Sequence, residues 1–365
     1  MENILILIGD DLKINMDFLL DIFKQYIDKF GFINRFKFIS KNDPKLPEVL
    51  EQLSKEQLFI TIFTSSSSYY VVAKILATLT KDELELKDEQ TLSLSRATKV
   101  CKNSFLTSLN SSYINLLKSD PLCDFPTIFY EKEPSFKDFY LFGYEIGEAK
   151  EELGKLAQRY NATINTIPYS RYLLLVRVER GEYLQLDSFL KECKEVFKNR
   201  VIFEKSIEEL VVKKLAKNEA KITFAESCTA GLCAATICNI AGSSEVFDGS
   251  LVTYSNQIKH IWLNVEEKVL KTYGAVSKEC VEQMLDGAIK GSGASFAIAI
   301  SGIAGPGGAT KDKPVGTVYI GVMQNGGKKI VQRFLIKGDR QSVRKESVNI
   351  AFSLLLVLRE DLFLD

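Results

Sequence analysis

The sequence predicts an α/β protein that contains an N-terminal α/β domain, a small α+β module and a C-terminal α/β domain. The chain has 365 residues, of which 46% are hydrophobic, and this is more than one ordinary domain needs. Buried strands alternate with helices in the first and last thirds, which is typical of sheets with right-handed crossovers. The stretch between them is about half a usual domain in length.

The N-terminal domain is expected to span residues 1–146. Residues 3–8 form a continuous apolar run that ends in Gly-Asp-Asp, as in a buried parallel strand followed by a polar loop. The segment MDFLLDIFKQYIDKFG has helical periodicity, residues 58–64 (LFITIFT) predict a second strand, and YYVVAKILATL predicts a second helix. From about residue 85 to 145 the chain is polar, and three prolines mark loops, so we expect irregular structure there.

The middle module is expected to span residues 147–205 and the C-terminal domain residues 206–365. In the module, a helix precedes the alternating segment YLLLVRVERG, a second helix and the short strand VIFEK. The C-terminal domain begins with the helix SIEELVVKKLAKNE and continues with strands in ITFAES, SLVTYS, FAIAISG, VGTVYIGVM and GGKKIVQRFLI. A long helix with Asp339 near its start closes the chain.

Composition excludes several classes of protein. Lysine and arginine together number 47, as do aspartate and glutamate, so no overall basic field would gather nucleic acid or an anionic membrane. Seven scattered cysteines are typical of reduced thiols, and no segment reaches the roughly 20 apolar residues of a membrane span. The apolar start of the chain is too short for a signal peptide. We therefore expect a cytoplasmic protein.

The single histidine, His260, limits the chemistry. A histidine-based zinc site and a Ser-His-Asp triad each need an imidazole in the right place, and one histidine makes both hard to build. Any reaction is therefore expected to use serine, lysine, tyrosine, aspartate or arginine.

The segment KITFAESCTAGLCAATI places polar residues between a predicted strand and a predicted helix. Ser227 would lie at the turn, where free backbone N–H groups and the positive helix end face the same space. The commoner use of Glu226, Ser227 or Thr229 is to cap the helix. Cys228 is a rival nucleophile, although cysteines in apolar surroundings are more often inert.

The segment SLVTYSNQIKH leads from a strand into Tyr254, Ser255 and Asn256, with Lys259 one helical turn beyond Ser255. A lysine that is partly desolvated at a cleft loses its preference for the charged form, so it can act as a general base in place of histidine. The alternative is a solvated lysine on a helix surface.

Two further elements could bind an anion. In FAIAISGIAGPGGATKDKPVG, a buried strand leads into a loop where glycines would let backbone N–H groups approach an anion, although a plain turn is the alternative. The loop matches neither a dinucleotide nor a triphosphate motif. Arg340 and Arg344 lie four residues apart on the last helix, so they would share one face and could grip a phosphate. A surface salt-bridge face is the default interpretation of such a pair.

Six motifs, in order, closely resemble the C-terminal domain of the CinA (competence/damage-inducible protein) family over about residues 205–360: AESCTAG, VTYSNQIK, GAVS, SGIAGPGG, KPVGTVYIG and GDRQSVR. Members of this family hydrolyse the amide of nicotinamide mononucleotide. The resemblance implies a serine amidohydrolase whose Ser/Lys dyad is Ser227 and Lys259, without a metal or cofactor. Ala230 stands where the family usually has glycine, and we expect this difference to have little effect.

Further roles are hypotheses that accompany this resemblance. Tyr254 is a catalytic candidate that would orient Lys259 or the substrate, and Arg340 or Arg344 would hold the 5′-phosphate. The other candidates for substrate binding are Glu226, Thr229, Asn256, Gly302, Ala304 and Gly305. Family resemblance also suggests a homodimer, with a small-molecule nucleotide as substrate and neither nucleic acid nor membrane as a partner.

The N-terminal domain resembles the family's first domain more weakly, a fold similar to molybdopterin-binding proteins that has been linked to ADP-ribose pyrophosphatase activity. Residues 9–12, Gly-Asp-Asp-Leu, partly match the family's Gly-Asp-Glu-Leu motif. Thr64 is followed by four serines instead of a glycine-rich loop, and an Asp-Asp pair for a divalent cation is missing. We expect weak or absent pyrophosphatase activity, with a divalent cation needed only if this domain is active.

The middle module resembles a KH-type unit, but it lacks the GXXG loop that such units use to bind RNA. Three hypotheses therefore remain for the whole chain. The first is an amidohydrolase that returns nicotinamide mononucleotide to the NAD pool. The second is a regulatory protein that binds a nucleotide without turnover, and the third is a bifunctional enzyme that also cleaves ADP-ribose.

Overall fold

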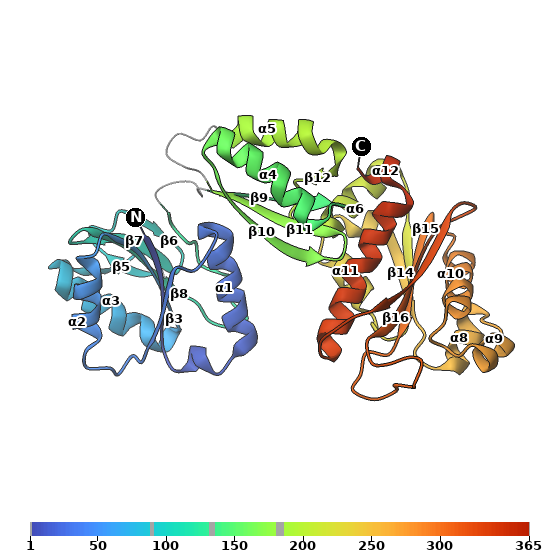
Figure 1. Cartoon of the computed structure of the whole chain (residues 1–365). Coiled ribbons are helices and arrows are strands. Elements are labelled where there is room, and N and C mark those ends of the chain that lie inside the picture. Colours follow the sequence, from blue (N-terminus) through green and yellow to red (C-terminus); the bar gives the residue numbers. More distant parts are fainter. Residues whose placement is uncertain (1, 88–90, 131–135, 180–185, 365) are drawn as a thin grey trace. The chain divides into compact units, whose positions relative to one another are not determined.

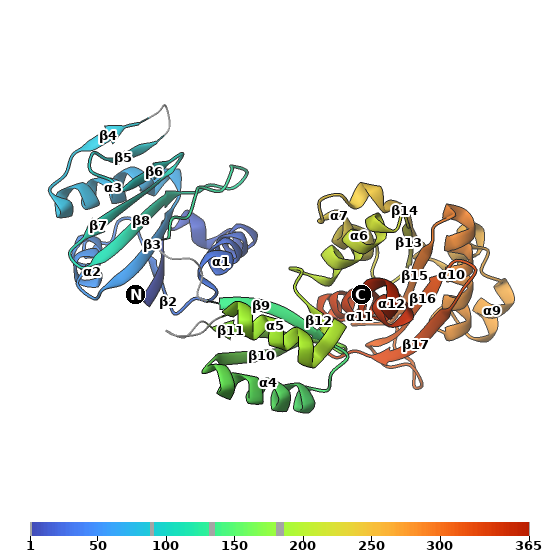
Figure 2. The ribbon, with the colours of Figure 1, turned by 90° about the horizontal axis from the view of Figure 1, so that it is seen from above.

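The structure is a computed structural model that describes residues 2–87, 91–130, 136–179 and 186–364 (Figures 1 and 2). The chain divides into two compact units, Met1–Ser135 and Phe136–Asp365. Within the described ranges, no helix combines the length and the apolar character that crossing a membrane requires.

The first unit is built around a six-stranded sheet with strand order β2-β1-β3-β8-β7-β6. The first four of these strands run parallel, and β7 and β6 are antiparallel to their neighbours. Helix α1 packs on one face of the sheet, and α2 and α3 pack on the other. The elements are β1 (Glu2–Ile8), α1 (Met16–Phe30), β2 (Arg35–Ile39), α2 (Leu46–Ser54), β3 (Leu58–Thr64), α3 (Ser66–Thr80), β6 (Lys99–Cys101), β7 (Ser104–Leu109) and β8 (Ser112–Lys118).

Strands β1 and β3 and helices α1 and α3 confirm the prediction, but β2 and α2, which lie between α1 and β3, were not predicted. The expectation of irregular structure from about residue 85 to 145 is wrong. This region contains β6 to β8 and a small two-stranded sheet of β4 (Leu84–Leu86) and β5 (Leu92–Leu94). Three of these strands have only three residues, too few to show a period. The longer β7 and β8 are buried but contain serine and asparagine, which lowers their apolar content.

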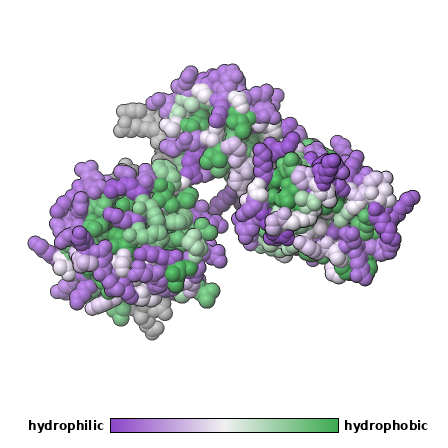
Figure 3. All heavy atoms as spheres, turned by 60° about the horizontal axis from the view of Figure 1, so that its bottom comes forward, coloured by the Kyte–Doolittle hydropathy of each residue, from purple (hydrophilic) through white to green (hydrophobic). Residues whose placement is uncertain are grey.

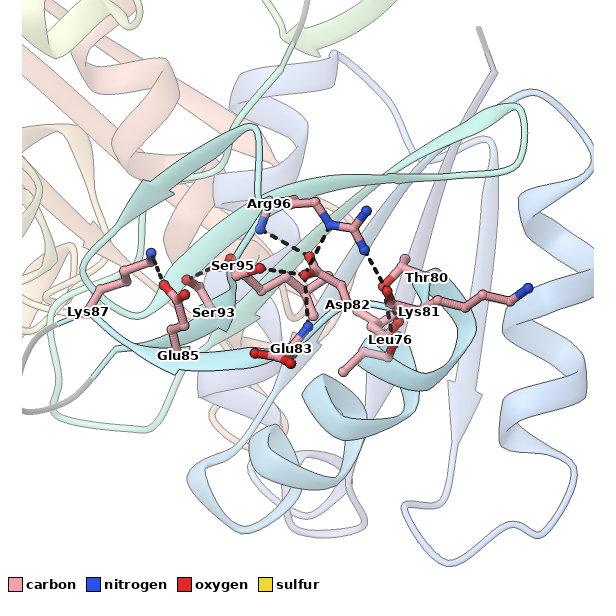
Figure 4. A network of polar contacts seen from close by, with 12 residues as sticks. Leu76, Thr80, Lys81, Asp82, Glu83, Glu85, Lys87, Ser93, Ser95 and Arg96 are labelled. Atoms are coloured by element: carbon pink, nitrogen blue, oxygen red, sulfur yellow. Dashed lines mark hydrogen bonds and ion pairs between the residues drawn. The ribbon is translucent and has the colours of Figure 1, made fainter.

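A polar network joins the end of α3 to the β4–β5 sheet (Figure 4). The carboxylate of Asp82 accepts hydrogen bonds from the Ser95 hydroxyl at 2.5 Å and from the amides of Arg96 and Glu83 at 3.0 and 2.8 Å. Burial raises the pKa of Asp82, but these hydrogen bonds outweigh it and lower the pKa to about 2. The network therefore stabilises the ionised form of Asp82.

Figure 3 shows apolar side chains gathered on the visible face of the first unit. The unit exposes large apolar side chains from α1 and β2, among them Met16, Leu20, Phe36 and Phe38. Strand β2 lies at an edge of the sheet, and Phe36 packs edge-on against Phe23 of α1.

The second unit begins with a four-stranded antiparallel sheet in the order β10-β11-β9-β12, covered by two helices. Its elements are β9 (Phe136–Phe142), α4 (Ile146–Tyr160), β10 (Thr163–Ser170), β11 (Leu173–Glu179), α5 (Leu186–Phe197) and β12 (Val201–Ile202). Strand β9 pairs with β11, so it belongs to this sheet, although the expected boundary at residue 146 placed it in the N-terminal domain.

The rest of the second unit is a three-layer α/β domain around a five-stranded sheet in the order β14-β13-β15-β16-β17. The first three strands are parallel, and the last two are antiparallel. Helix α10 covers one face of the sheet, and α6, α7 and α11 cover the other (Figure 1). The elements are α6 (Ile207–Lys217), β13 (Ile222–Glu226), α7 (Leu232–Cys238), β14 (Phe247–Val252), α8 (Asn256–Leu263), α9 (Glu267–Thr272), α10 (Lys278–Ser292), β15 (Phe296–Gly302), β16 (Thr317–Gln324), β17 (Lys329–Leu335), α11 (Arg340–Leu358) and α12 (Glu360–Phe363).

The module and the three-layer domain share a hydrophobic core. Phe142 and Ile202 of the module belong to the same buried cluster as Leu210 and Phe363 of the domain. Arg200 also donates two hydrogen bonds to the carboxylate of Glu360, at 3.2 and 2.8 Å. A continuous core and a bidentate ion pair therefore hold the two parts together.

Candidate active site

Ser227 and Lys259 are in contact at the carboxyl ends of the parallel strands. Ser227 directly follows β13, and the side chain of Ser255 caps α8, so that Lys259 lies one turn into that helix. The Lys259 Nζ atom is 2.9 Å from the Ser227 Oγ atom, 2.7 Å from the carbonyl oxygen of Thr253 and 3.3 Å from that of Tyr254. The lysine is thus held by three oxygen atoms.

Burial lowers the pKa of this lysine. Only 1% of Lys259 is exposed, and 9% of Ser227. Desolvation lowers the pKa of Lys259, and the nearby thiols of Cys280 and Cys228 act weakly in the opposite direction. A neutral amine at this position can donate its two N–H groups to the two carbonyl oxygens and direct its lone pair at the Ser227 hydroxyl.

The amides at the start of α7 are not available to a ligand, contrary to the prediction from the sequence. The helix begins only at Leu232, and the amides of Cys233 and Ala234 donate to the Glu226 carboxylate at 3.0 and 3.1 Å. Glu226 is fully buried and also accepts a bond from Ser250 at 3.4 Å. Glu226 therefore caps α7 and is not turned toward a substrate, because its oxygens are already satisfied within the fold.

The turn between Ser227 and α7 has left-handed backbone at two successive residues, Ala230 with φ +49° and Gly231 with φ +89°. Only glycine adopts this region without steric conflict, and another residue costs about 1–2 kcal/mol there. Alanine at position 230 therefore lowers the stability of the fold more than was expected from the sequence.

Two arginines of α11 join the three loops that follow the parallel strands. Arg340 donates to the carbonyl oxygen of Gly305 at 2.7 Å and to the Tyr254 hydroxyl at 2.9 Å. Arg344 donates to the carbonyl oxygen of Thr229 at 2.6 Å. The predicted arginine pair therefore lies beside the Ser–Lys pair, and both guanidinium groups contact backbone of the surrounding loops.

The glycine loop has a different role from the one expected. A Cβ atom on Gly302 would lie 2.7 Å from a methyl of Val318 and 2.9 Å from the carbonyl oxygen of Thr317, so glycine is required here by close packing on β16. Ala304 is buried in the core, and Gly305, with φ +87°, directs its carbonyl oxygen at Arg340. The interactions of this loop are thus with protein groups.

Three more candidates stand as follows. The Tyr254 hydroxyl contacts Arg340 and not Lys259, while its backbone carbonyl contacts Lys259. Asn256 is exposed at the first position of α8 and makes no side-chain hydrogen bond within the described ranges. In the described part of the chain, the buried hydroxyl of Thr229 has no hydrogen-bond partner. Thr253 was not predicted from the sequence, because it contacts Lys259 through its backbone carbonyl oxygen, and every residue type has this group.

Cys228 is not equipped to act as a nucleophile. The residue is 5% exposed, and burial raises the pKa of its thiol to about 11. The thiolate is the nucleophilic form, and this environment suppresses it.

In the first unit, acidic residues and serines meet at the carboxyl ends of the parallel strands. The Ser67 hydroxyl donates to Asp11 at 3.2 Å, and the Ser66 amide and hydroxyl donate to Asp120 at 3.0 and 2.6 Å. Asp120 was not recognised in the sequence because it follows a strand that was not predicted. In the part of the chain that the structure describes, no group of three or more His, Cys, Asp or Glu residues could hold a metal ion.

The fold and these contacts define a three-layer α/β domain with a buried Ser–Lys pair. Residues 204–358 match the model of the CinA C-terminal domain, and the chain belongs to the CinA family.

Several relatives illustrate the match. A CinA-like protein of Prochlorococcus marinus is 35% identical over 261 residues, which are 68% of this chain and 61% of that protein. A CinA-like protein of Fervidobacterium nodosum is 45% identical over 42% of this chain and 37% of its own length. The chain spans about half the length of the curated relatives it matches. Among solved structures, the competence/damage inducible protein CihA of Agrobacterium tumefaciens is 38% identical over 43% of this chain and 98% of its own, with a TM-score of 0.41.

Proposed function

We propose that the C-terminal domain hydrolyses the carboxamide of nicotinamide mononucleotide to nicotinate mononucleotide and ammonia. The observation that carries the proposal is the 2.9 Å contact between the buried Lys259 amine and the Ser227 hydroxyl. A serine hydroxyl is a weak nucleophile unless a base removes its proton, and a desolvated lysine is such a base.

In the proposed mechanism, neutral Lys259 takes the proton of Ser227 as its oxygen attacks the carboxamide carbon. The resulting ammonium has three N–H groups, and the oxygens of Ser227, Thr253 and Tyr254 are placed to accept them. Lys259 then protonates the carboxamide nitrogen of the tetrahedral intermediate, the C–N bond breaks and ammonia leaves. Water hydrolyses the acyl-enzyme with the neutral Lys259 again as base.

The tetrahedral intermediate needs backbone donors for its oxyanion. The amides of Ser227, Ala230 and Ile303 already donate, to the carbonyl oxygens of Ile300, Ser227 and Thr317. Among the residues that the structure describes, the amides of Cys228 and Thr229 donate to no other residue. We assign the oxyanion to the Cys228 amide, because the residue after a nucleophile commonly supplies this donor.

We assign the 5′-phosphate to Arg344 rather than Arg340. Arg340 already uses both terminal nitrogens in contacts with Gly305 and Tyr254. Among the residues that the structure describes, Arg344 uses one terminal nitrogen, and its buried Nε atom has no hydrogen-bond partner. A buried unsatisfied donor costs about 1–3 kcal/mol, which a bound phosphate oxygen would offset. In this proposal Arg340 is a positioning residue that holds Tyr254 and the loop at Gly305.

The proposal is tested by measuring ammonia release from nicotinamide mononucleotide with purified full-length protein and a metal chelator. We expect activity that falls by about 10³-fold or more in each of Ser227→Ala and Lys259→Met. Cys238→Ser, at an exposed cysteine at the end of α7, serves as the control and should retain most activity. Binding of the nucleotide without turnover would instead support a regulatory protein. Divalent-dependent release of AMP from ADP-ribose, measured separately without the chelator, would instead support a bifunctional enzyme.

A further inference from the structure

The second unit contains a pocket of about 570 Å³ that shares no residue with the candidate active site. It lies where the module meets the three-layer domain, between α5 and β12 on one side and α6 and α12 on the other. Its size is within the range of about 300–1,000 Å³ that is typical of sites for small molecules.

The floor of the pocket is apolar and well fixed. Ile202, Leu210, Phe363 and Leu364 line it, and each of them is at least nine-tenths buried and belongs to the shared core. Phe203 adds an aromatic ring that packs on Phe139. Val201 and Phe203 remain partly exposed above these buried side chains, so they supply the apolar contact for the non-polar body of a ligand on a rigid base.

The rim of the pocket is basic. Among the residues that the structure describes, four lysines line it, at positions 194, 198, 213 and 214, and one carboxylate, Glu204, so that the positive charge of the rim comes mainly from Lys194 and Lys198. Glu204 is already paired with Lys213 at 3.0 Å. The ammonium of Lys194 lies over the ring of Phe203, 4.9 Å from its centre, which fixes this charge at the edge of the pocket. The rim thus attracts an anionic group that stays close to water.

We infer that this pocket binds a small amphipathic anion, with its aromatic or aliphatic body on the apolar floor and its sulfonate, phosphate or carboxylate at the lysine rim. Charge complementarity favours this class of ligand. The lysines would repel a cation, and an uncharged apolar molecule would gain no electrostatic attraction from them. The ligand touches both parts of the unit, so it joins the module more firmly to the three-layer domain. The inference does not depend on the proposed amidase.

Anilinonaphthalene sulfonate is a suitable probe, since it carries an aromatic body and one anionic group. Its fluorescence would be titrated with the native full-length protein, beside phenylnaphthylamine, which lacks the sulfonate. We expect one saturable site with affinity that falls between low and high salt, and at least tenfold weaker binding of the uncharged analogue. Bound probe should also raise the midpoint of thermal unfolding.

Variants locate the site. Lys194→Gln combined with Lys198→Gln should weaken binding by about fivefold, because exposed charges each contribute modestly. The matched control combines Lys191→Gln on α5 with Lys217→Gln on α6; both helices line the pocket, but neither of these two lysines does. Absence of saturable binding, equal affinity for the uncharged analogue, or equal effects of the two double variants would each overturn the inference.

Discussion

Lys259 should produce the same pKa in two independent assays. In the folded protein its pKa lies below the ordinary value of 10.5, because the amine is buried. Between the folded pKa and 10.5, the unfolded chain binds a proton that the folded chain does not. The free energy of unfolding therefore rises with pH in this window, by up to about 1.4 kcal/mol per pH unit. Below the folded pKa both states are protonated, and this contribution to the slope vanishes.

The unfolding free energies of the parent protein and of Lys259→Met would be measured from pH 6 upward. Subtracting the value of the variant from that of the parent removes the contribution of the other titrating groups. Trp262, the single tryptophan, lies on α8 and reports on unfolding of this domain. The difference should increase with pH up to 10.5, whereas Lys268→Met, an exposed lysine on α9, should give a flat difference.

The kinetic assay follows the same proton. If neutral Lys259 is the base, log kcat/KM rises by about one per pH unit until the folded pKa is reached and then levels off. The pH at which the rate levels off should coincide with the pH at which the stability difference begins to rise. A stability difference that stays flat, or a rate that levels off at a different pH, would refute the assignment of Lys259 as general base.

Four more results are expected. Arg344→Lys should lower kcat/KM for nicotinamide mononucleotide by about tenfold or more but leave turnover of the phosphate-free riboside unchanged, with Lys345→Gln as the control in the same steady-state assay. Ala230→Gly should raise the thermal midpoint by about 1–2 °C. The substitution removes the strain of a left-handed alanine, and this gain in free energy slightly exceeds the cost of the greater conformational entropy that glycine gives the unfolded chain; a lower midpoint would contradict the strain argument. Asp82→Asn should lower the free energy of unfolding of the first unit by about 1–2 kcal/mol above pH 4, measured by hydrogen exchange of peptides around the β4–β5 sheet. Because the pKa of Asp82 is lowered in the folded state, the stability difference between the parent and the variant should disappear as the pH falls toward 2. Cys228 should resist iodoacetamide in the native protein while the exposed cysteines react, and rapid labelling of Cys228 would contradict its high pKa.

Long periodic segments carried most of the fold prediction. The strand at residues 58–64 and the helix after it follow from an apolar run and a helical period, and both were predicted. Strand β8 was missed because Asn115 interrupts its apolar sequence, although that residue is buried in the structure. Strand β9 was missed as well, since its pairing with β11 joins residues that are far apart in the sequence, from Phe142 with Leu173 to Phe136 with Glu179, and leaves little local signal.

At the candidate site, the sequence identified residue types but not the directions in which their groups point. Ser227 and Lys259 were predicted as partners, and the structure places them in contact. Glu226 and the loop at Gly302 were expected near the substrate, yet the first caps α7 and the second packs on β16. These outcomes depend on which backbone groups are already satisfied, and that is settled only by tertiary structure.

The contacts of the two arginines suggest how substrate binding and the nucleophile are coupled. Arg344 is bonded to the carbonyl oxygen of Thr229, two residues after Ser227, so a phosphate held by Arg344 would be positioned relative to the nucleophile through a very short piece of backbone. Binding energy from a group remote from the reacting bond can then be used to align the carboxamide with the Ser227 oxygen. A substrate without its phosphate should therefore lose kcat as well as affinity, whereas a phosphate that served only for attachment would change KM alone.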